Sequence, residues 1–243
     1  MTLANVVDLL SPGSTSTVND AIFAQQVTQP TGTGIYDPFL RLQNSPIENA
    51  FNTDFRQNGQ APLDAKSDPH THSLLMSSLK VINVGGIDYY GFKLDIDEPN
   101  SGPKSLLSLD ELRFYVENAP NLDQLSDLTH LAWDMDAGMN STVYMDGSDL
   151  SSGNGADDMQ LLLKKSYFDA IGATGDQYLY LYSKFGATSG MRADLGADAS
   201  YEEWAALANA QVVPPPQVPE PGSMVLLGTG LAGFAGWRAR RKK

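Results

Sequence analysis

The sequence predicts a mainly β protein: an antiparallel β-sandwich with short helices, followed by a C-terminal transmembrane helix. Three features of its 243 residues predict this fold class. Apolar and polar residues alternate along several short stretches, turn-forming residues separate those stretches, and a long uncharged run near the C-terminus is followed directly by cations. Alternation with a period of two marks a strand with one buried face, and many short strands joined by turns are typical of a sandwich.

The clearest strand signal surrounds Gly85-Gly86. The two glycines separate an apolar run over residues 81–84 from a longer run over residues 87–97, which is the pattern of a hairpin with a two-residue turn. In the second half of this run, Phe92, Leu94 and Ile96 alternate with Lys93, Asp95 and Asp97, so one face of the strand is expected to be buried and the other solvated. Further strands are predicted over residues 112–117, 131–134, 141–145 and 177–185.

Helical patterns are scarce in this sequence. Residues 157–165 fit either a short helix or a strand. Residues 200–209 predict a final helix, because Ser200 can serve as the N-cap and Glu203, three residues later, can complete a capping box.

Composition divides the chain into four parts. Residues 1–20 contain a polar, turn-like stretch and are expected to form a flexible N-terminal lead-in. Residues 21–210 are expected to form the β-sandwich domain, whose length suits a single sandwich. Residues 211–218 are rich in proline and predict a stiff linker. Residues 219–243 form a separate C-terminal segment with a charge pattern of its own.

The charge of the chain is unevenly distributed. It holds 16 Lys and Arg against 29 Asp and Glu, a net charge of −13, yet the part before Pro219 holds 11 basic and 28 acidic residues, a net charge of −17. So acidic a body repels phosphate backbones, which excludes nucleic acid as a partner. There is no cysteine, which excludes disulfides, thiolate metal sites and cysteine nucleophiles.

The C-terminal segment has three consecutive parts. Val218, Pro219, Glu220 and Pro221 come first, and residues 224–237 then form an uncharged, glycine-rich run that predicts a membrane-spanning helix. Cations close the chain at Arg238, Arg240, Arg241, Lys242 and Lys243. The positive-inside rule places this basic end in the cytoplasm and the acidic body on the other side of the membrane. A buried core helix followed by a solvated basic tail is the alternative.

This order of motif, short apolar helix and basic end resembles the PEP-CTERM sorting signal of Gram-negative bacteria. The resemblance covers about the last 25 residues. It implies that an exosortase recognises the chain and cleaves it near Pro219-Glu220-Pro221, that the precursor is anchored in the inner membrane, and that the product is exported to the cell surface or to an extracellular matrix of exopolysaccharide, as in a biofilm.

One loop is a candidate calcium site. Asp134, Asp136 and Asn140 place oxygen-bearing side chains around Gly138, and a loop of this kind can surround Ca²⁺ with oxygen ligands. The loop is not an EF-hand, because its twelfth position is Met145 instead of a glutamate. The alternative is that these residues are there because they form turns. No other cofactor is expected.

Three further groups have a chemical and a structural interpretation each. Asp95 and Asp97 share one face of a strand and could bind a cation or act as a carboxylate couple, although a solvated strand face is the commoner reason for such a pair. His70 and His72 could chelate a metal, or lie in an exposed turn. Tyr178, Tyr180 and Tyr182 could form a sugar-stacking platform, or line the edge of the core.

These observations predict an exported structural or adhesive protein that is not an enzyme. Motifs of serine hydrolases and nucleotide-binding proteins are absent from the sequence. Extracellular polysaccharide is a candidate partner, and a carbohydrate-binding, lectin-like or carbohydrate-active protein is the alternative function.

Overall fold

The computed structural model describes residues 5–11, 13–25, 37–96, 105–147, 158–187, 193–198 and 200–207. Within these ranges the protein is mainly β, with fourteen strands and one α-helix, α1 (Lys165–Ala170). Three single turns of 3-10 helix complete the described elements, at Met76–Ser78, Leu125–Asp127 and Ala193–Leu195. The chain divides into two units, Met1–Val213 and Pro214–Lys243, and every element described here belongs to the first.

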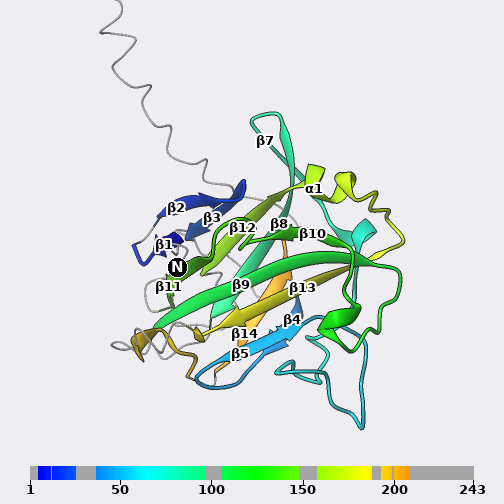
Figure 1. Cartoon of the computed structure of the whole chain (residues 1–243), viewed down its shortest axis with the longest axis horizontal. Helices are drawn as coiled ribbons and strands as arrows, with labels where there is room; N and C mark the ends of the chain where they lie inside the picture. The colour runs from blue at the N-terminus through cyan, green and yellow to red at the C-terminus, as the bar shows by residue number, and fades with distance from the viewer. Residues whose placement is uncertain are drawn as a thin grey trace, which may run out of the picture. The chain divides into compact units, whose positions relative to one another are not determined.

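The first sheet contains seven strands. Its main path is β1 (Asn5–Leu9), β11 (Ser141–Asp146), β9 (Leu106–Glu117), β13 (Tyr178–Phe185) and β5 (Glu48–Phe51), while β10 (Leu131–Asp134) pairs with β9 and β6 (Leu74–Leu75) pairs with β13. Figure 1 shows the long strands β9 and β13 side by side across the domain. The pairing of β1 with β11 is parallel and the other described pairings are antiparallel, so this sheet is mixed.

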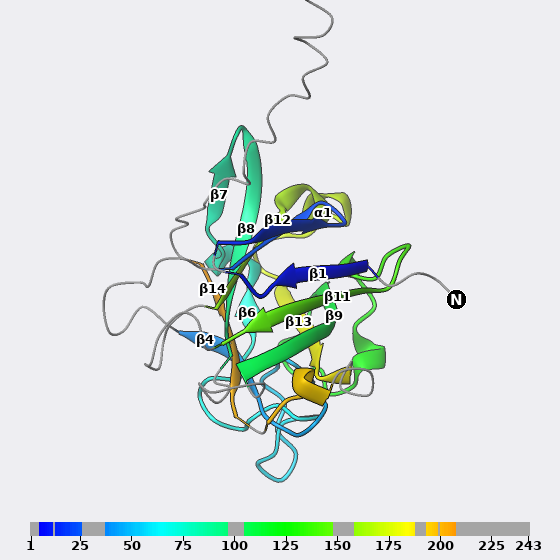
Figure 2. The ribbon, with the colours of Figure 1, turned by 90° about the vertical axis from the view of Figure 1, so that its left-hand side faces the viewer.

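The second sheet also contains seven strands. They run in the order β2 (Thr15–Val18), β3 (Ala21–Gln25), β12 (Met159–Lys164), β8 (Ile87–Ile96), β14 (Glu202–Ala206) and β4 (Pro38–Leu42), and β7 (Val81–Val84) pairs with the first half of β8. The hairpin of β7 and β8 extends away from the other strands (Figure 2). Its turn confirms the glycine signal, because Gly85 and Gly86 both have positive φ, at 60° and 86°.

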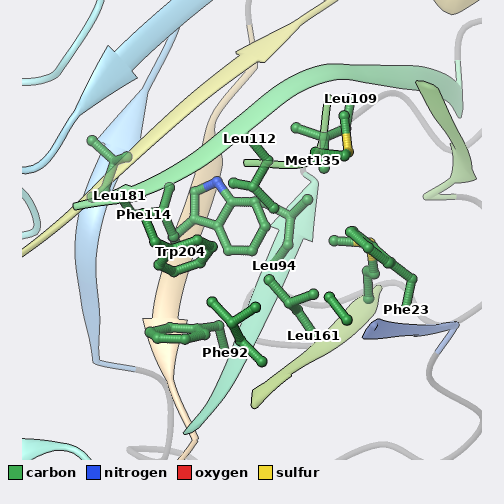
Figure 3. Packing of buried hydrophobic residues seen from close by; sticks show 14 of the residues in the cluster. Phe23, Phe92, Leu94, Leu109, Leu112, Phe114, Met135, Leu161, Leu181 and Trp204 are labelled. Atoms are coloured by element: carbon green, nitrogen blue, oxygen red, sulfur yellow. The ribbon is translucent and has the colours of Figure 1, made fainter. Parts of the chain in front are cut away.

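The two sheets face each other across one hydrophobic core. Phe92 from β8 meets Phe114 from β9 with 4.7 Å between ring centroids, and Trp204 from β14 lies among the core residues of both sheets (Figure 3). The Trp204 indole Nε1 donates to Ser183 Oγ of β13 at 3.1 Å, so its one polar atom is satisfied. The predicted antiparallel sandwich is therefore correct in its two facing sheets and needs correction at the parallel strand β1.

The flexible lead-in predicted over residues 1–20 is wrong for the part that the structure describes. Residues 5–9 and 15–18 form β1 and β2, one strand in each sheet. Their inward side chains are Val7, Leu9 and Val18, each at most 3% exposed. Asp8 interrupts the apolar run in sequence, but it lies on the exposed face of the strand, where a polar residue costs little. Asn5 is half-buried at the start of the strand.

The final helix predicted over residues 200–209 is also wrong. Residues 202–206 form β14, which is inserted between β8 and β4 and paired with both. Glu202 and Trp204 are fully buried there. Backbone hydrogen bonds to two neighbours and the burial of a tryptophan outweigh a local capping pattern, whose contribution is about 1 kcal/mol. Over residues 157–165 the strand alternative is correct, and the helix α1 follows β12 directly.

The predicted transmembrane helix over residues 224–237 lies outside the described residues, as do the linker and the basic end. Among the helices of the described ranges, none is long and apolar enough to cross a membrane.

Candidate functional site

The acidic loop from Asp134 to Asn140 is a tight connection between β10 and β11. The Asp136 N–H donates to Asp134 Oδ1, and the Ser141 N–H donates to Asp136 Oδ1, each at 2.8 Å. The Asn140 carbonyl accepts from the Asn5 N–H of β1 at 2.8 Å. These bonds are those of a turn stabilised by its own aspartates, so each candidate calcium ligand has a structural role in this loop.

Arg113 connects this loop to the outer face of the first sheet. Its Nε lies 3.2 Å from Asp134 Oδ2 and its Nη2 lies 3.0 Å from Glu111 Oε2, while Lys184 Nζ contacts Glu111 Oε1 at 3.1 Å. Burial raises the pKa of Asp136, and the nearby carboxylates of Asp134 and Glu111 act in the same direction. Among the described residues, no three His, Asp or Glu side chains form a group that could hold a metal ion. Calcium binding by Asp134, Asp136 and Asn140 stays a prediction.

The tyrosine row of β13 is part of the core edge, and the sugar platform is wrong for it. Tyr180 is fully buried and Tyr182 is 5% exposed, in a cluster with Phe51, Tyr115 and Leu128. The Tyr180 hydroxyl donates to the Ala119 carbonyl at 2.7 Å and accepts from the Leu122 N–H at 3.2 Å. Burial raises the pKa of both Tyr180 and Tyr182 to about 12. An aromatic ring that is enclosed in this way offers no face to a sugar.

The histidine pair lies in a turn before β6. The His70 N–H donates to Asp68 Oδ1 at 2.9 Å, and the His72 ring Nδ1 lies 2.8 Å from the Ser73 carbonyl. Both side chains are half-buried. The turn interpretation accounts for these contacts. Asp95 is half-buried on β8, whereas its predicted companion Asp97 lies outside the described residues.

The structure reveals a carboxyl pair that the sequence analysis did not identify. Glu48 of β5 and Glu202 of β14 are both fully buried, and their carboxyl groups lie close together between the two sheets. Glu48 Oε2 accepts from the Asn44 N–H at 2.8 Å. Two carboxyl groups can share a hydrogen bond only when one of them carries a proton. Burial raises the pKa of Glu48, which favours the protonated form of its carboxyl group.

A sequence signal for this pair did exist. In residues 48–51 and 202–206 the period of a strand places Glu48 on the face of Ala50, and Glu202 on the face of Trp204. Each glutamate is thus on the core side of its strand. That the two meet is not visible in the sequence, because more than 150 positions separate them.

The candidate sorting residues Val218, Pro219, Glu220 and Pro221 and the terminal cations lie outside the described residues, so comparison with known proteins bears on them instead. A family model for the PEP-CTERM protein-sorting motif matches residues 217–242. No curated protein matches the chain.

Among solved structures, the chain is similar to one from work entitled "Comparison of Family 12 Glycoside Hydrolases and Recruited Substitutions Important for Thermal Stability". The identity is 10%, the match covers 82% of this chain and 97% of that chain, and the TM-score is 0.24. A structural similarity this weak supports no statement about the activity of this protein.

The motif match defines a class: proteins that carry a C-terminal signal for sorting. Within that class, this chain is a PEP-CTERM sorting domain-containing protein. Its motif is recognised by an exosortase, and it implies export by way of a membrane-anchored precursor. The processing partner predicted from the sequence is thereby confirmed.

Proposed function

We propose that the protein is a structural or adhesive component of the cell surface or the extracellular matrix and that it has no enzymatic activity. Its β-domain stays tethered to the inner membrane by the C-terminal helix, with the basic end in the cytoplasm, until an exosortase cleaves near Pro219-Glu220-Pro221. The single observation that carries this proposal is the sorting motif over residues 217–242.

Two properties of the β-domain support the structural role. A net charge of −17 before Pro219 keeps the released domain soluble and favours bridging by cations over contact with anionic surfaces. The carboxylates of the acidic loop are engaged in ion pairs and turn hydrogen bonds, and the carboxyl pair of Glu48 and Glu202 is fully buried. Neither arrangement is that of a carboxylate couple that flanks a substrate cleft.

The sorting step is tested by replacing Pro219, Glu220 and Pro221 with alanine in a host that holds the exosortase. The wild-type β-domain is expected to leave the membrane fraction as a shortened chain, and the variant is expected to remain there at full length. Alanine at Pro214, Pro215 and Pro216 is the matched control, because it removes as many prolines from the linker outside the motif. Release of the motif variant at the wild-type rate would contradict the proposal.

Membrane orientation has a separate test, which the lack of native cysteine makes simple. Single cysteines are introduced by Ser126→Cys in an exposed 3-10 turn and by Lys243→Cys at the C-terminus. In intact spheroplasts expressing the uncleavable motif variant, a membrane-impermeant maleimide is expected to label the first and spare the second. Labelling of both, or of the C-terminus alone, contradicts the proposed orientation.

A further inference from the structure

A groove lies between two loops of the first sheet, away from the acidic loop. One wall comes from the segment after β5 and the other from the segment between β9 and β10. The groove has a volume of about 300 Å³, which is the lower end of the range for pockets that hold small molecules. The residues that line it are Phe55, Gln57, Gln60, Ala61, Pro62, Leu63, Asp123 and Gln124.

Hydrogen bonds between the loops fix the groove in shape. The Asp54 N–H donates to the Pro120 carbonyl at 2.9 Å, and Thr53 Oγ donates to the Leu122 carbonyl at 2.7 Å. Both bonds join one wall to the other. Because the walls are tied together before any ligand arrives, little conformational entropy is lost on binding.

The tip of the first wall is a small hairpin. Gln57 and Gln60 exchange two backbone hydrogen bonds of 2.9 Å around Asn58-Gly59. Asn58 and Gly59 have positive φ of 52° and 79°, as a two-residue turn of this type requires. The hairpin therefore holds Gln57 and Gln60 opposite each other in a set geometry, and both side chains are exposed at the groove.

Leu63, at the rim of the groove, has an unusual backbone conformation and an exposed side chain. Its φ is +56°, a left-handed conformation that bulky residues rarely adopt, and its side chain is 52% exposed. The strain is maintained by neighbouring backbone bonds, from the Ala65 N–H to the Pro62 carbonyl and from the Asp64 N–H to the Asn49 carbonyl. Strained backbone conformations of this kind cluster at active sites, ligand clamps and switch regions.

The chemistry of the lining selects the ligand. It contains three primary amides, which donate and accept hydrogen bonds, one carboxylate and one aromatic ring, and no cation. Arg56 lies between two lining residues, but its guanidinium donates to the carbonyls of Thr53, Phe55 and Thr71 instead. An anionic ligand would thus meet a negative charge without a counter-charge, and a purely apolar ligand would leave the amides unpaired.

We propose that this groove binds a neutral sugar residue. Sugar hydroxyls match amides because both donate and accept, the Asp123 carboxylate accepts from a hydroxyl, and the apolar ring face of a sugar packs on Phe55 and Leu63. The proposal deepens the adhesive part of the proposed function, on which it rests, by giving that adhesion a site and a ligand class.

The test uses the purified full chain in a detergent that has no sugar headgroup. Saturation-transfer NMR measures binding of two neutral probes, cellotriose and maltotriose, and of the anionic probe trigalacturonate. Gln60→Ala and Gln124→Ala each remove one groove amide. Asn121→Ala is the matched control, since it removes an exposed amide from the same loop outside the lining.

At least one neutral trisaccharide is expected to bind, more tightly than trigalacturonate. Each groove variant should weaken that binding about five- to tenfold, which is the effect of one hydrogen bond, while Asn121→Ala leaves it unchanged. All three variants should keep the thermal midpoint of the wild type, because the altered side chains are exposed.

Three results would overturn the proposal: no saturation transfer from either neutral probe, unchanged affinity in both groove variants, or equal or tighter binding of trigalacturonate. These results leave the sorting experiment untouched. A chain that is released normally but binds no sugar contradicts the groove alone, and a chain that binds sugar but is released without its motif contradicts the sorting proposal alone.

Discussion

The buried carboxyl pair and the acidic loop accommodate negative charge in opposite ways. Around the loop, Arg113 forms ion pairs with both Asp134 and Glu111, and these three side chains are 21% to 26% exposed. At the pair, Glu48 and Glu202 are fully buried, and burial raises the pKa of Glu48. In a body of net charge −17, a carboxylate near the surface is neutralised by a cation, and one in the core is neutralised by protonation.

The largest effect is expected from the buried pair at alkaline pH. The pKa of Glu48 is raised above 4.5, its unfolded value, so the stability that comes from the pair is fully present below that value and is lost as pH rises through the folded pKa. Thermal unfolding from pH 4 to 9 should show this loss. Glu48→Gln keeps the shape and removes the charge, so it should flatten the curve and stabilise the protein at pH 9 by about 3 kcal/mol.

Glu203→Gln on the neighbouring position of β14 is the control for that experiment. Glu203 lies on the opposite face of the strand, where it pairs with Arg41. Its replacement should leave the alkaline loss of stability in place. If Glu48→Gln and the wild type lose stability equally between pH 4 and 9, the pKa of Glu48 is not raised in the folded protein.

The second effect concerns the ion-paired carboxylates. Arg113→Met keeps most of the side-chain volume but removes the cation that pairs with both Asp134 and Glu111, which leaves Glu111 with Lys184 alone. This change should cost about 1–2 kcal/mol in the free energy of unfolding. Chemical denaturation at neutral pH measures it. Lys184→Met removes a cation with a single partner, Glu111, and is expected to cost less than 1 kcal/mol. An equal loss in both variants would mean that Arg113 has no special role.

The third effect extends the comparison to a neutral buried group. Tyr180→Phe leaves the Ala119 carbonyl and the Leu122 N–H without the hydroxyl that now satisfies both. The expected cost is about 1 kcal/mol, measured by denaturation. Tyr178→Phe serves as the control, because this ring is only partly buried against the same cluster. A neutral result for Tyr180→Phe would show that the loop over residues 119–122 finds other partners.

The smallest effect is expected from calcium. A weak extracellular-type site with a Kd of about 0.1–1 mM would add roughly 0.4–1.4 kcal/mol at 1 mM Ca²⁺. The thermal midpoint is compared in Ca²⁺ and in EDTA, for the wild type and for Asp136→Asn. A midpoint that Ca²⁺ does not move in the wild type would remove the predicted site at Asp134, Asp136 and Asn140.

Local patterns in the sequence were sufficient where one segment determines its own conformation. The turn at Gly85-Gly86 and the alternation from Phe92 to Ile96 predict a hairpin and a strand with no help from elsewhere, and both are confirmed. The solvated face predicted for this strand is wrong, because Lys93 is 3% exposed and Asp95 is half-buried. The sorting motif is of the same kind, since its recognition depends on a linear order of residues.

Prediction failed where distant segments decide the outcome. Ser200 and Glu203 form a plausible helix start, but β4 and β8 provide two strand partners for residues 202–206. The row from Tyr178 to Tyr182 allowed two interpretations, a sugar platform or a core edge, and it is the loop over residues 119–128 packed against it that decides for the core. The groove follows the same rule: the Asn58-Gly59 turn is visible in the sequence, whereas the opposing wall at Asp123 and Gln124 is not.

The position of β14 determines the order in which the domain can fold. It is the last described strand of the chain, yet it lies between β8 and β4, both of which are made much earlier. Until residue 206 is available, β8 and β4 both lack the neighbouring strand that β14 provides, and the core lacks Trp204. In a chain that crosses a membrane from its N-terminus, the second sheet therefore stays incomplete until β14 has crossed. Completion of the second sheet requires residues 202–206, which lie only a short distance in sequence before the sorting motif at residues 217–242.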